Sequence, residues 1–412
     1  MSSPTSDAQD LFDRGYAALR AEDFHEAVEC LTRAIALRPG VAAGYRYRAH
    51  AFLGLRDRVR AVADYDHAVK LKPDDAQLRA ERAAELLKQR RYDAAAADCD
   101  AALRLDPGRA DVLAVRGRCR AALGDSAGAA EDFTAAAALD PDGAPDYLTR
   151  RARLRLECGD FAAAEADADA AVRLDPGSAA ALEARALARQ ELGDPDGAAA
   201  DFAEAARLTP GAVGPRLGLA LVLFRARAWA GAAAAADEVL ALSPGSAPAL
   251  EIRGLARQEA GDLAGALADC DALVAAAPGR AAGYVLRGGV HAARGDFPAA
   301  VRDYLDALAR DPEDAGAFNH LAWVWATAAD PAARDGPRAR EFATRACELT
   351  GWGRADYLDT LAAACAEAGD FAAAVAWQEK AVGLAAGEGD EAFRARLDLY
   401  RAGRPYRATP PG

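Results

Sequence analysis

Nine prolines recur along the chain at a nearly constant interval, and this periodicity constrains the fold more than any other feature. The series consists of Pro39, Pro73, Pro107, Pro141, Pro176, Pro210, Pro244, Pro278 and Pro312. Seven of its eight intervals are 34 residues and the other is 35. A fixed period of roughly 20 to 50 residues is the signature of repeat architectures. The chain is therefore predicted to be an array of similar units rather than a set of unrelated domains.

A second signal lies near the middle of many periods, where a glycine is followed by an aspartate. The pairs are Gly124-Asp125, Gly159-Asp160, Gly193-Asp194, Gly261-Asp262, Gly295-Asp296 and Gly369-Asp370. Glycine ends a helix in the left-handed conformation, and aspartate caps the helix that follows. Because proline then breaks the chain after the second helix, each period is predicted to form a helix, a tight turn, a second helix and a turn.

Composition supports a helical array and excludes several kinds of ligand. Apolar residues make up 52% of the chain, much of it alanine, which is the strongest helix former. The formal net charge of −13 argues against nucleic acid as a ligand and against docking on an anionic membrane. No apolar run approaches the length of a membrane-spanning helix, so no membrane insertion is predicted.

When the repeats are aligned on the prolines, small residues recur at fixed positions. Position 8 holds Gly15, Ala49, Ala83, Gly117, Ala152, Ala186, Ala220, Gly254, Gly288, Ala322 and Ala362. Position 24 is often large, as in Leu31, Tyr65, Phe133, Phe202 and Tyr304. A large residue at position 8 would overpack the hairpin, at about 1–3 kcal/mol each. This pattern resembles the tetratricopeptide repeat family, in particular its multi-repeat bacterial members.

The resemblance implies an all-α fold: a right-handed superhelical α-solenoid of about eleven helix-turn-helix repeats with a C-terminal capping helix. The repeats are expected to start near residues 8, 42, 76, 110, 145, 179, 213, 247, 281, 315 and 355. A single solenoid is thus expected over 8–388, preceded by a disordered polar tail over 1–7. Residues 389–407 are expected to form the capping helix and a tail, with 408–412 disordered.

Within most repeats, an arginine at position 7 accompanies an aspartate at position 23. The pairs are Arg48 and Asp64, Arg82 and Asp98, Arg116 and Asp132, Arg151 and Asp167, Arg185 and Asp201, Arg253 and Asp269, and Arg287 and Asp303. The seventh and eleventh repeats lose both members together, and the first repeat is an exception, with Arg14 facing Cys30. This joint presence and absence predicts a partly buried ion pair between the two helices of a hairpin. The alternative is an arginine ladder that grips carboxylates of a ligand.

No catalytic, metal or cofactor site is predicted. The five histidines show no i, i+4 ligand spacing with a carboxylate, and no phosphate-binding glycine loop is present. The seven cysteines are far apart and form no CxxC pair. This pattern favours small core residues and a reducing, cytoplasmic location. The chain has no leader-like apolar segment at its start, which favours the same location.

The resemblance also implies a concave groove lined by the first helix of each hairpin, mainly at positions 2, 5, 6, 9, 12 and 13. Two candidate surfaces emerge, an N-terminal aromatic and basic one and a C-terminal apolar one, joined by arginines. The expected groove residues are Phe12, Tyr16, Arg46, Tyr47, His50, Arg118, Arg150, Arg153, Leu217, Leu221, Phe224, Leu286, His320 and Trp323. The family's carboxylate clamp for chaperone tails needs an asparagine, and none precedes Asn319. For each groove residue, ordinary packing or solvated surface is the alternative.

The predicted function is that of a non-catalytic scaffold or adaptor that holds a peptide or helix of another protein in the groove. Two other functions are compatible with the sequence. The chain could be a structural protein that assembles with copies of itself through its terminal hairpins. It could also be a docking or regulatory subunit of a separate enzyme system.

Overall fold

The computed structural model describes residues 4–385 and 390–408, and within these ranges the chain is helical with no strand. The chain packs as two compact halves, here called the N-half (Met1–Leu208) and the C-half (Thr209–Gly412), and each is described by itself. The all-α repeat solenoid predicted from the sequence is confirmed. Its right-handed path and the single array over 8–388 stay predictions.

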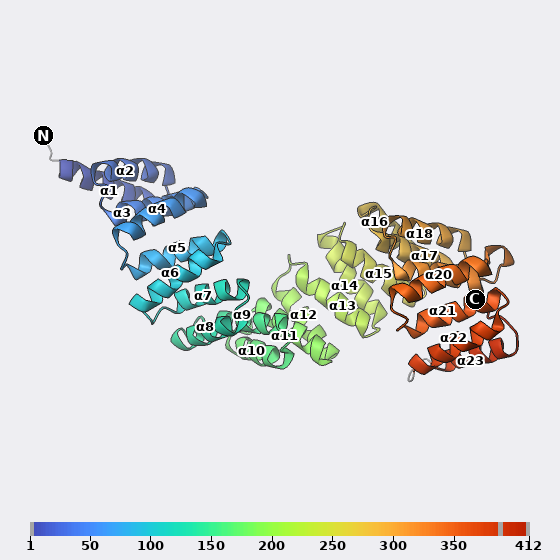
Figure 1. The fold of residues 1–412 in the computed structure, drawn as a ribbon. Coiled ribbons are helices and arrows are strands. Elements are labelled where there is room, and N and C mark those ends of the chain that lie inside the picture. Colours follow the sequence, from blue (N-terminus) through green and yellow to red (C-terminus); the bar gives the residue numbers. More distant parts are fainter. Residues whose placement is uncertain (1–3, 386–389, 409–412) are drawn as a thin grey trace. The chain divides into compact units, whose positions relative to one another are not determined.

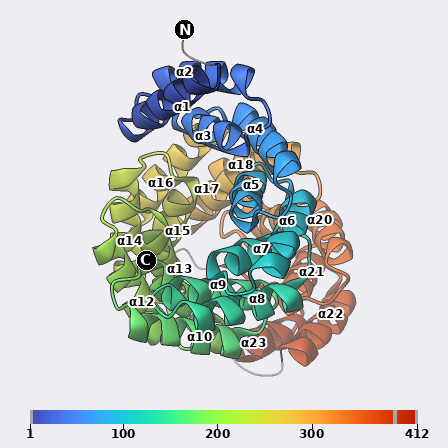
Figure 2. The same cartoon turned by 90° about the vertical axis from the view of Figure 1, so that its left-hand side faces the viewer.

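Over residues 4–208 the N-half consists of six helical hairpins, whose helices are labelled α1 to α12 in Figure 1. They are α1 (Pro4–Arg20) with α2 (Phe24–Leu37), α3 (Ala42–Gly54) with α4 (Arg58–Leu71), α5 (Ala76–Lys88) with α6 (Tyr92–Leu105), α7 (Ala110–Ala122) with α8 (Ser126–Leu139), α9 (Ala144–Glu157) with α10 (Phe161–Leu174), and α11 (Ala179–Leu192) with α12 (Pro195–Leu208). Each second helix packs on the first helix of the next hairpin in this half. Figure 2 shows the first two hairpins side by side.

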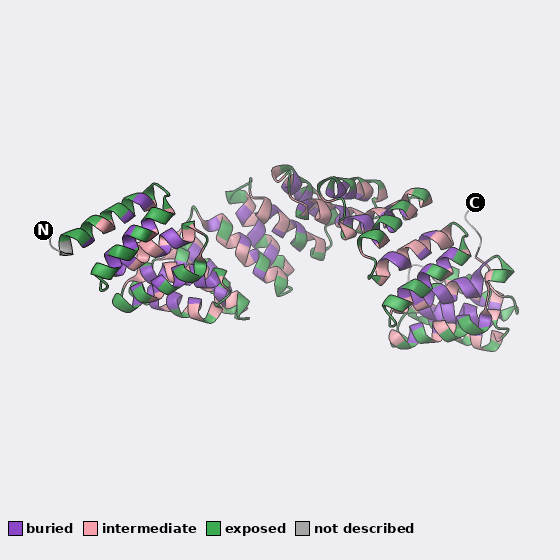
Figure 3. Cartoon of the chain, turned by 90° about the horizontal axis from the view of Figure 1, so that it is seen from above, coloured by how far each residue is buried: buried purple, intermediate pink, exposed green. Residues whose placement is uncertain are grey.

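The C-half contains five hairpins and a terminal helix. They are α13 (Gly214–Arg225) with α14 (Trp229–Leu242), α15 (Ala247–Glu259) with α16 (Leu263–Ala276), α17 (Ala281–Ala293) with α18 (Phe297–Arg310), α19 (Ala315–Thr327) with α20 (Gly336–Leu349), and α21 (Ala355–Glu367) with α22 (Phe371–Leu384), followed by α23 (Asp390–Arg401). A short 3-10 helix, η1 (Pro331–Ala333), lies between α19 and α20. Figure 3 shows buried and exposed positions alternating along the helices, as expected for helices covered on one side.

The ends of the chain differ from the sequence expectation. Helix α1 begins at Pro4, so residues 4–7 are helical rather than part of a disordered tail. Proline is tolerated there because the first turn of a helix needs no N–H donor. Ala408 is also ordered, since its N–H donates to the carbonyl of Thr327 at 2.9 Å. Residues 1–3, the boundary at 388 and residues 409–412 lie outside the described residues.

The glycine–aspartate turns have the predicted geometry. Gly124 has a φ of 88°, and the side chain of Asp125 accepts the N–H of Gly128 as an N-cap of α8. The other five pairs repeat both features. Four hairpins have a non-glycine residue with positive φ at the same position: Glu22, Arg56, Arg90 and Arg227. The left-handed turn is therefore required by the hairpin, and glycine only makes it easier to form.

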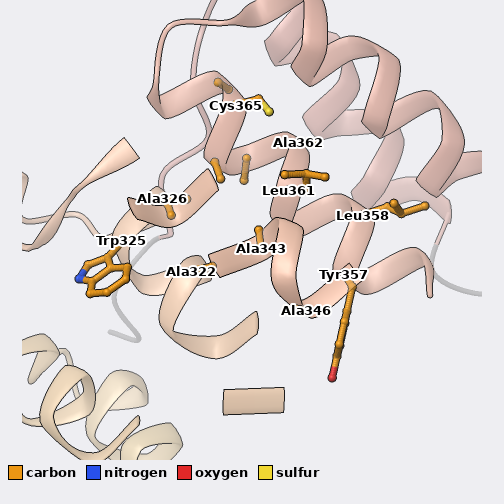
Figure 4. Close-up of a cluster of buried hydrophobic side chains, with 14 of the residues drawn as sticks. Ala322, Trp325, Ala326, Ala343, Ala346, Tyr357, Leu358, Leu361, Ala362 and Cys365 are labelled. Atoms are coloured by element: carbon orange, nitrogen blue, oxygen red, sulfur yellow. The ribbon is translucent and has the colours of Figure 1, made fainter. Parts of the chain in front are cut away.

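Small residues at position 8 let the two helices of a hairpin approach closely. A methyl group added to Gly288 would lie 2.8 Å from the ring of Tyr304, which is 2% exposed. The same addition at Gly117 would lie 3.0 Å from the ring of Phe133. Figure 4 shows small side chains, among them Ala322 and Ala362, in the largest apolar cluster of the C-half. The predicted pairing of a small residue with a large one is thus confirmed in these hairpins.

The predicted arginine–aspartate pairs form in all seven repeats, with guanidinium-to-carboxylate distances of 2.5 to 2.7 Å. Each arginine also uses its free Nη1 for a partner at position 25 of the preceding hairpin. This second bond was not predicted. It joins Arg48 to Thr32, Arg82 to Asp66, Arg116 to Asp100, Arg151 to Thr134, Arg185 to Asp169, Arg253 to Asp237 and Arg287 to Asp271. In these seven repeats the arginine therefore ties its hairpin to the preceding one as well as joining the two helices of its own hairpin.

Four repeats add a second arginine to the same buried aspartate. Arg120, at position 11, donates to Asp132 at 3.0 Å, and Arg155, Arg189 and Arg257 repeat the contact. Long arginine side chains at this position could lie across apolar surface, but here they pair with a buried carboxylate. These arginine–aspartate pairs stabilise the repeats, and they leave few of the arginine guanidinium groups free to bind a ligand.

Candidate functional site

Two first helices of the N-half bring the predicted aromatic residues together. Phe12 and Tyr16 of α1 contact Tyr47 of α3, with ring centroids 5.7 and 4.8 Å apart. Tyr47 also lies edge-on to His50, at 5.9 Å. Tyr16 is exposed, whereas Phe12, Tyr47 and His50 are partly buried. These four residues are called the N-terminal aromatic patch. Aromatic rings in edge-to-face contact stabilise one another and hold the surface in shape.

Arg46 and His50 meet a carboxylate that the sequence analysis missed, Glu81 of α5. The Nε atom of Arg46 donates to Glu81 Oε2 at 3.0 Å, and Nη2 bonds to the other oxygen. His50 Nε2 lies 3.1 Å from Glu81 Oε2, and Gln77 donates to the carboxylate at 2.8 Å. Glu81 stands at position 6 of the third repeat, a groove position, so the repeat alignment contained the signal.

The charge of Glu81 is fixed by its partners. Burial by itself would raise the pKa of this carboxyl, but hydrogen bonds from His50, Arg46 and Gln77 outweigh it and lower the pKa from 4.5 to about 2. The guanidinium of Arg46 is therefore paired with a permanent carboxylate at neutral pH. The patch presents aromatic surface to a ligand rather than an unpaired positive charge.

This network predicts a pH dependence of stability. Because the pKa of Glu81 is lower in the folded chain, its contribution is fully present above pH 4.5 and is lost as the pH falls toward about 2. With a discount for solvent screening of this partly exposed carboxyl, the shift corresponds to about 1–2 kcal/mol of unfolding free energy. Urea unfolding measured at pH 5 and at pH 2.5 should show that the natural chain loses more unfolding free energy between these two pH values than Glu81→Gln does. Equal losses in the two proteins would contradict the assignment.

The predicted arginines of the middle repeats do not form a shared site with the patch. Arg150 pairs with Asp146 one turn earlier on α9, at 2.7 Å. Arg118 and Arg153 are exposed on α7 and α9. Burial raises the pKa of Glu183 on α11, and the charge of Arg153 partly offsets this. These side chains form a polar, solvated stretch of the first-helix surface.

The predicted apolar residues of the C-half are largely packing residues. Leu217, Leu221 and Phe224 of α13 are partly buried against one core cluster, which also holds Leu286 of α17. The ring of Phe224 lies 5.2 Å from that of Trp229. Because these side chains already pack on their own half of the molecule, they offer less free surface than the sequence suggested.

The last two predicted residues, on α19, have different surroundings. His320 is exposed and stacks on Tyr304 with centroids 5.6 Å apart. Trp323 is contacted by two side chains from the C-terminal segment. Its ring centroid lies 5.8 Å from that of Tyr406 and 5.6 Å from the guanidinium carbon of Arg396. The chain itself therefore covers the expected anchor at Trp323.

Nothing in the described ranges points to catalysis or metal binding. The seven cysteines are free thiols, and six of them are buried, with Cys158 exposed. Burial raises the pKa of Cys119 and Cys365 to about 11, which disfavours the reactive thiolate. Residues 4–385 and 390–408 hold no cluster of histidine, cysteine and carboxylate side chains suited to a metal ion. In the same part of the chain, no helix combines the length and apolarity needed to cross a bilayer.

Comparison with known proteins gives matches to one family. The tetratricopeptide repeat model matches residues 12–76, 81–144, 149–213, 184–247, 217–281 and 285–351. Yeast Tom70 is 14% identical with a TM-score of 0.44, over 96% of each chain. Pseudomonas aeruginosa pilF is 21% identical with a TM-score of 0.43, over 51% of this chain and 96% of its own. YrrB, a repeat protein with an unusual peptide-binding site, is 21% identical with a TM-score of 0.39, over 45% and 94%. No curated protein matches the chain in sequence.

Proposed function

Because the chain belongs to the tetratricopeptide repeat family, whose repeats mediate protein–protein interaction, we propose that it is a non-catalytic scaffold that binds a peptide or helix of another protein at the N-terminal aromatic patch. The observation that carries the proposal is the convergence of Phe12, Tyr16, Tyr47 and His50 on the first helices of consecutive hairpins. Tyrosine and tryptophan side chains commonly dominate binding energy at interfaces.

The chemistry of the patch narrows the ligand. Arg46 and His50 are both committed to Glu81, so a ligand carboxylate would have to displace an existing partner. The rings offer apolar edges and faces on a surface that is already held in place, which lowers the entropy lost on binding. The patch therefore favours a segment that inserts aromatic or aliphatic side chains. It does not favour a terminal carboxylate of the kind that chaperone tails present.

The compartment is part of the same proposal. Seven unpaired cysteines, spread over both halves, fit the reducing cytoplasm. The predicted alternatives, self-assembly and a docking role in an enzyme system, stay predictions.

Tyr47→Ala is expected to weaken ligand binding at least tenfold, because Tyr47 is the ring that Phe12, Tyr16 and His50 all contact. Peptides selected from a random display library against the natural chain would be titrated by fluorescence anisotropy. Val59→Ala serves as the matched control, since Val59 lies in the same repeat but on the second helix, 77% exposed. If the selected peptides bind Tyr47→Ala as tightly as Val59→Ala, the patch is not the binding surface.

A further inference from the structure

The segment that follows α23 leaves its helix through a left-handed glycine and returns to the first helices of the last two hairpins. Gly403 has a φ of 66°, and residues 404–408 form no regular secondary structure. The N–H of Ala408 donates to the carbonyl of Thr327, and Arg407 Nη1 donates to the carbonyl of Ala326 at 3.4 Å. Residues 404–408 are called the tail.

Two side chains of the tail add specific contacts. Tyr406 lies against the ring of Trp323. The guanidinium carbon of Arg396 lies over the ring of Tyr406, 5.3 Å from the centroid of that ring. Arg407 Nη2 lies 2.6 Å from a carboxylate oxygen of Glu367, which is itself 14% exposed. A ring contact, an ion pair and hydrogen bonds to two backbone carbonyls therefore hold the tail on this surface.

These contacts fall on the surface that the repeat alignment assigns to the groove. Trp323, Ala326 and Thr327 stand at positions 9, 12 and 13 of the tenth repeat, and Glu367 stands at position 13 of the eleventh. Ala326 and Thr327 are in the last turn of α19, whose carbonyls have no partner within the helix. A helix C-terminus favours N–H donors and cations. An extended chain with an aromatic residue followed by arginine supplies a ring for Trp323, a cation for Glu367 and N–H donors for the carbonyls at the end of α19.

Helix α23 makes contacts of its own with the last hairpins, in addition to those of the tail. Leu397 and Tyr400 of α23 are buried, and Arg396 pairs with the buried Asp359 of α21 at 2.7 Å. Tail residues 405–408 are only partly buried, and Arg404 is exposed. Glu367 also keeps a second partner, Arg334, at 3.1 Å. The surface under the tail would therefore stay in shape if the tail left it.

We propose that the α19–α21 surface is a second peptide-binding site, for an extended segment of a partner protein that carries an aromatic residue followed by arginine, and that the tail is its built-in competitor. A segment tethered this closely acts at an effective concentration of about millimolar. A partner must therefore bind well, or be abundant, to displace it. This site is separate from the N-terminal aromatic patch, so either proposal can fail without the other.

The test uses a labelled synthetic peptide of residues 401–408 and fluorescence anisotropy. A chain that ends at Arg401 is expected to bind this peptide at least tenfold more tightly than the full chain, because its site is open. The same peptide carrying Tyr406→Ala and Arg407→Ala should bind at least tenfold more weakly to the shortened chain. Glu367→Gln in the shortened chain should weaken binding of the natural peptide to a similar degree.

A full-length variant guards against misfolding of the shortened chain. Tyr406→Ala with Arg407→Ala keeps the chain length but removes both tail side chains from the surface, so it should bind the natural peptide like the shortened chain. Arg404→Ala is the matched control. Because the side chain of Arg404 is exposed, the tail of this variant should still cover the site, and the peptide should bind as weakly as it does to the full chain. If a natively helical double variant binds the peptide no better than Arg404→Ala does, the tail is a structural cap and the proposal is wrong.

Discussion

Arg48→Leu is expected to destabilise the N-half by about 3–5 kcal/mol. Asp64 is 5% exposed, and Arg48 donates to both of its carboxylate oxygens at 2.7 Å. Removing the guanidinium leaves a buried carboxylate without a cationic partner, and it also breaks the bond to Thr32 of the preceding hairpin. Urea unfolding, followed by the circular dichroism of the helices, measures the loss.

Two comparison variants make this result specific. The double variant Arg48→Leu with Asp64→Leu should lose less stability than Arg48→Leu alone, because it leaves no buried charge without a partner. Arg116→Leu should also lose less than Arg48→Leu, since Arg120 still pairs with Asp132 at 3.0 Å. A double variant as unstable as Arg48→Leu would show that the pair is not what stabilises the hairpin.

Tyr304→Ala is expected to lower the stability of the C-half by about 3–5 kcal/mol. Tyr304 is 2% exposed and fills the space beside Gly288, where a methyl group would already be too close to its ring. Because glycine has no side chain to move into the vacated space, the cavity stays open. Chemical denaturation monitored by tryptophan fluorescence reports on this half, which contains all five tryptophans of the chain.

Leu305→Ala is the matched control, one residue further along α18. Leu305 is 44% exposed, and its truncation should change stability by no more than about 0.5 kcal/mol. Comparable losses for the two variants would mean that position 24 is not a core position in this hairpin.

The helix boundaries could be predicted from the sequence because they depend on local chemistry. Each proline of the series follows the last residue of a second helix by two positions, as Pro39 follows Leu37. Eight first helices begin at the predicted residues, namely α3, α5, α7, α11, α15, α17, α19 and α21, and α9 and α13 begin one residue away. The start of α1 was missed because it has no preceding hairpin, so no proline and no repeat neighbour marks it.

The candidate sites were only partly predictable. Tyr47 and its neighbours were found because the repeat alignment places them on first helices. The role of Glu81 depends on rotamers that join α3 and α5, and the ion pair between Arg407 and Glu367 joins residues 40 positions apart. No period links Arg407 to Glu367. The packing of Leu217, Leu221, Phe224 and Leu286 against a core cluster was also not predicted, since hydrophobic residues at groove positions can equally complete the core.

The bond from each position-7 arginine to position 25 of the preceding hairpin makes neighbouring repeats chemically interchangeable. Asp66 meets Arg82, and one repeat later Asp100 meets Arg116 in the same way. Excision of residues 76–109 would therefore bring Asp66 to Arg116 and leave an equivalent junction. Such a chain can gain or lose whole repeats, over the stretch that carries the bond, without redesign of the new seam.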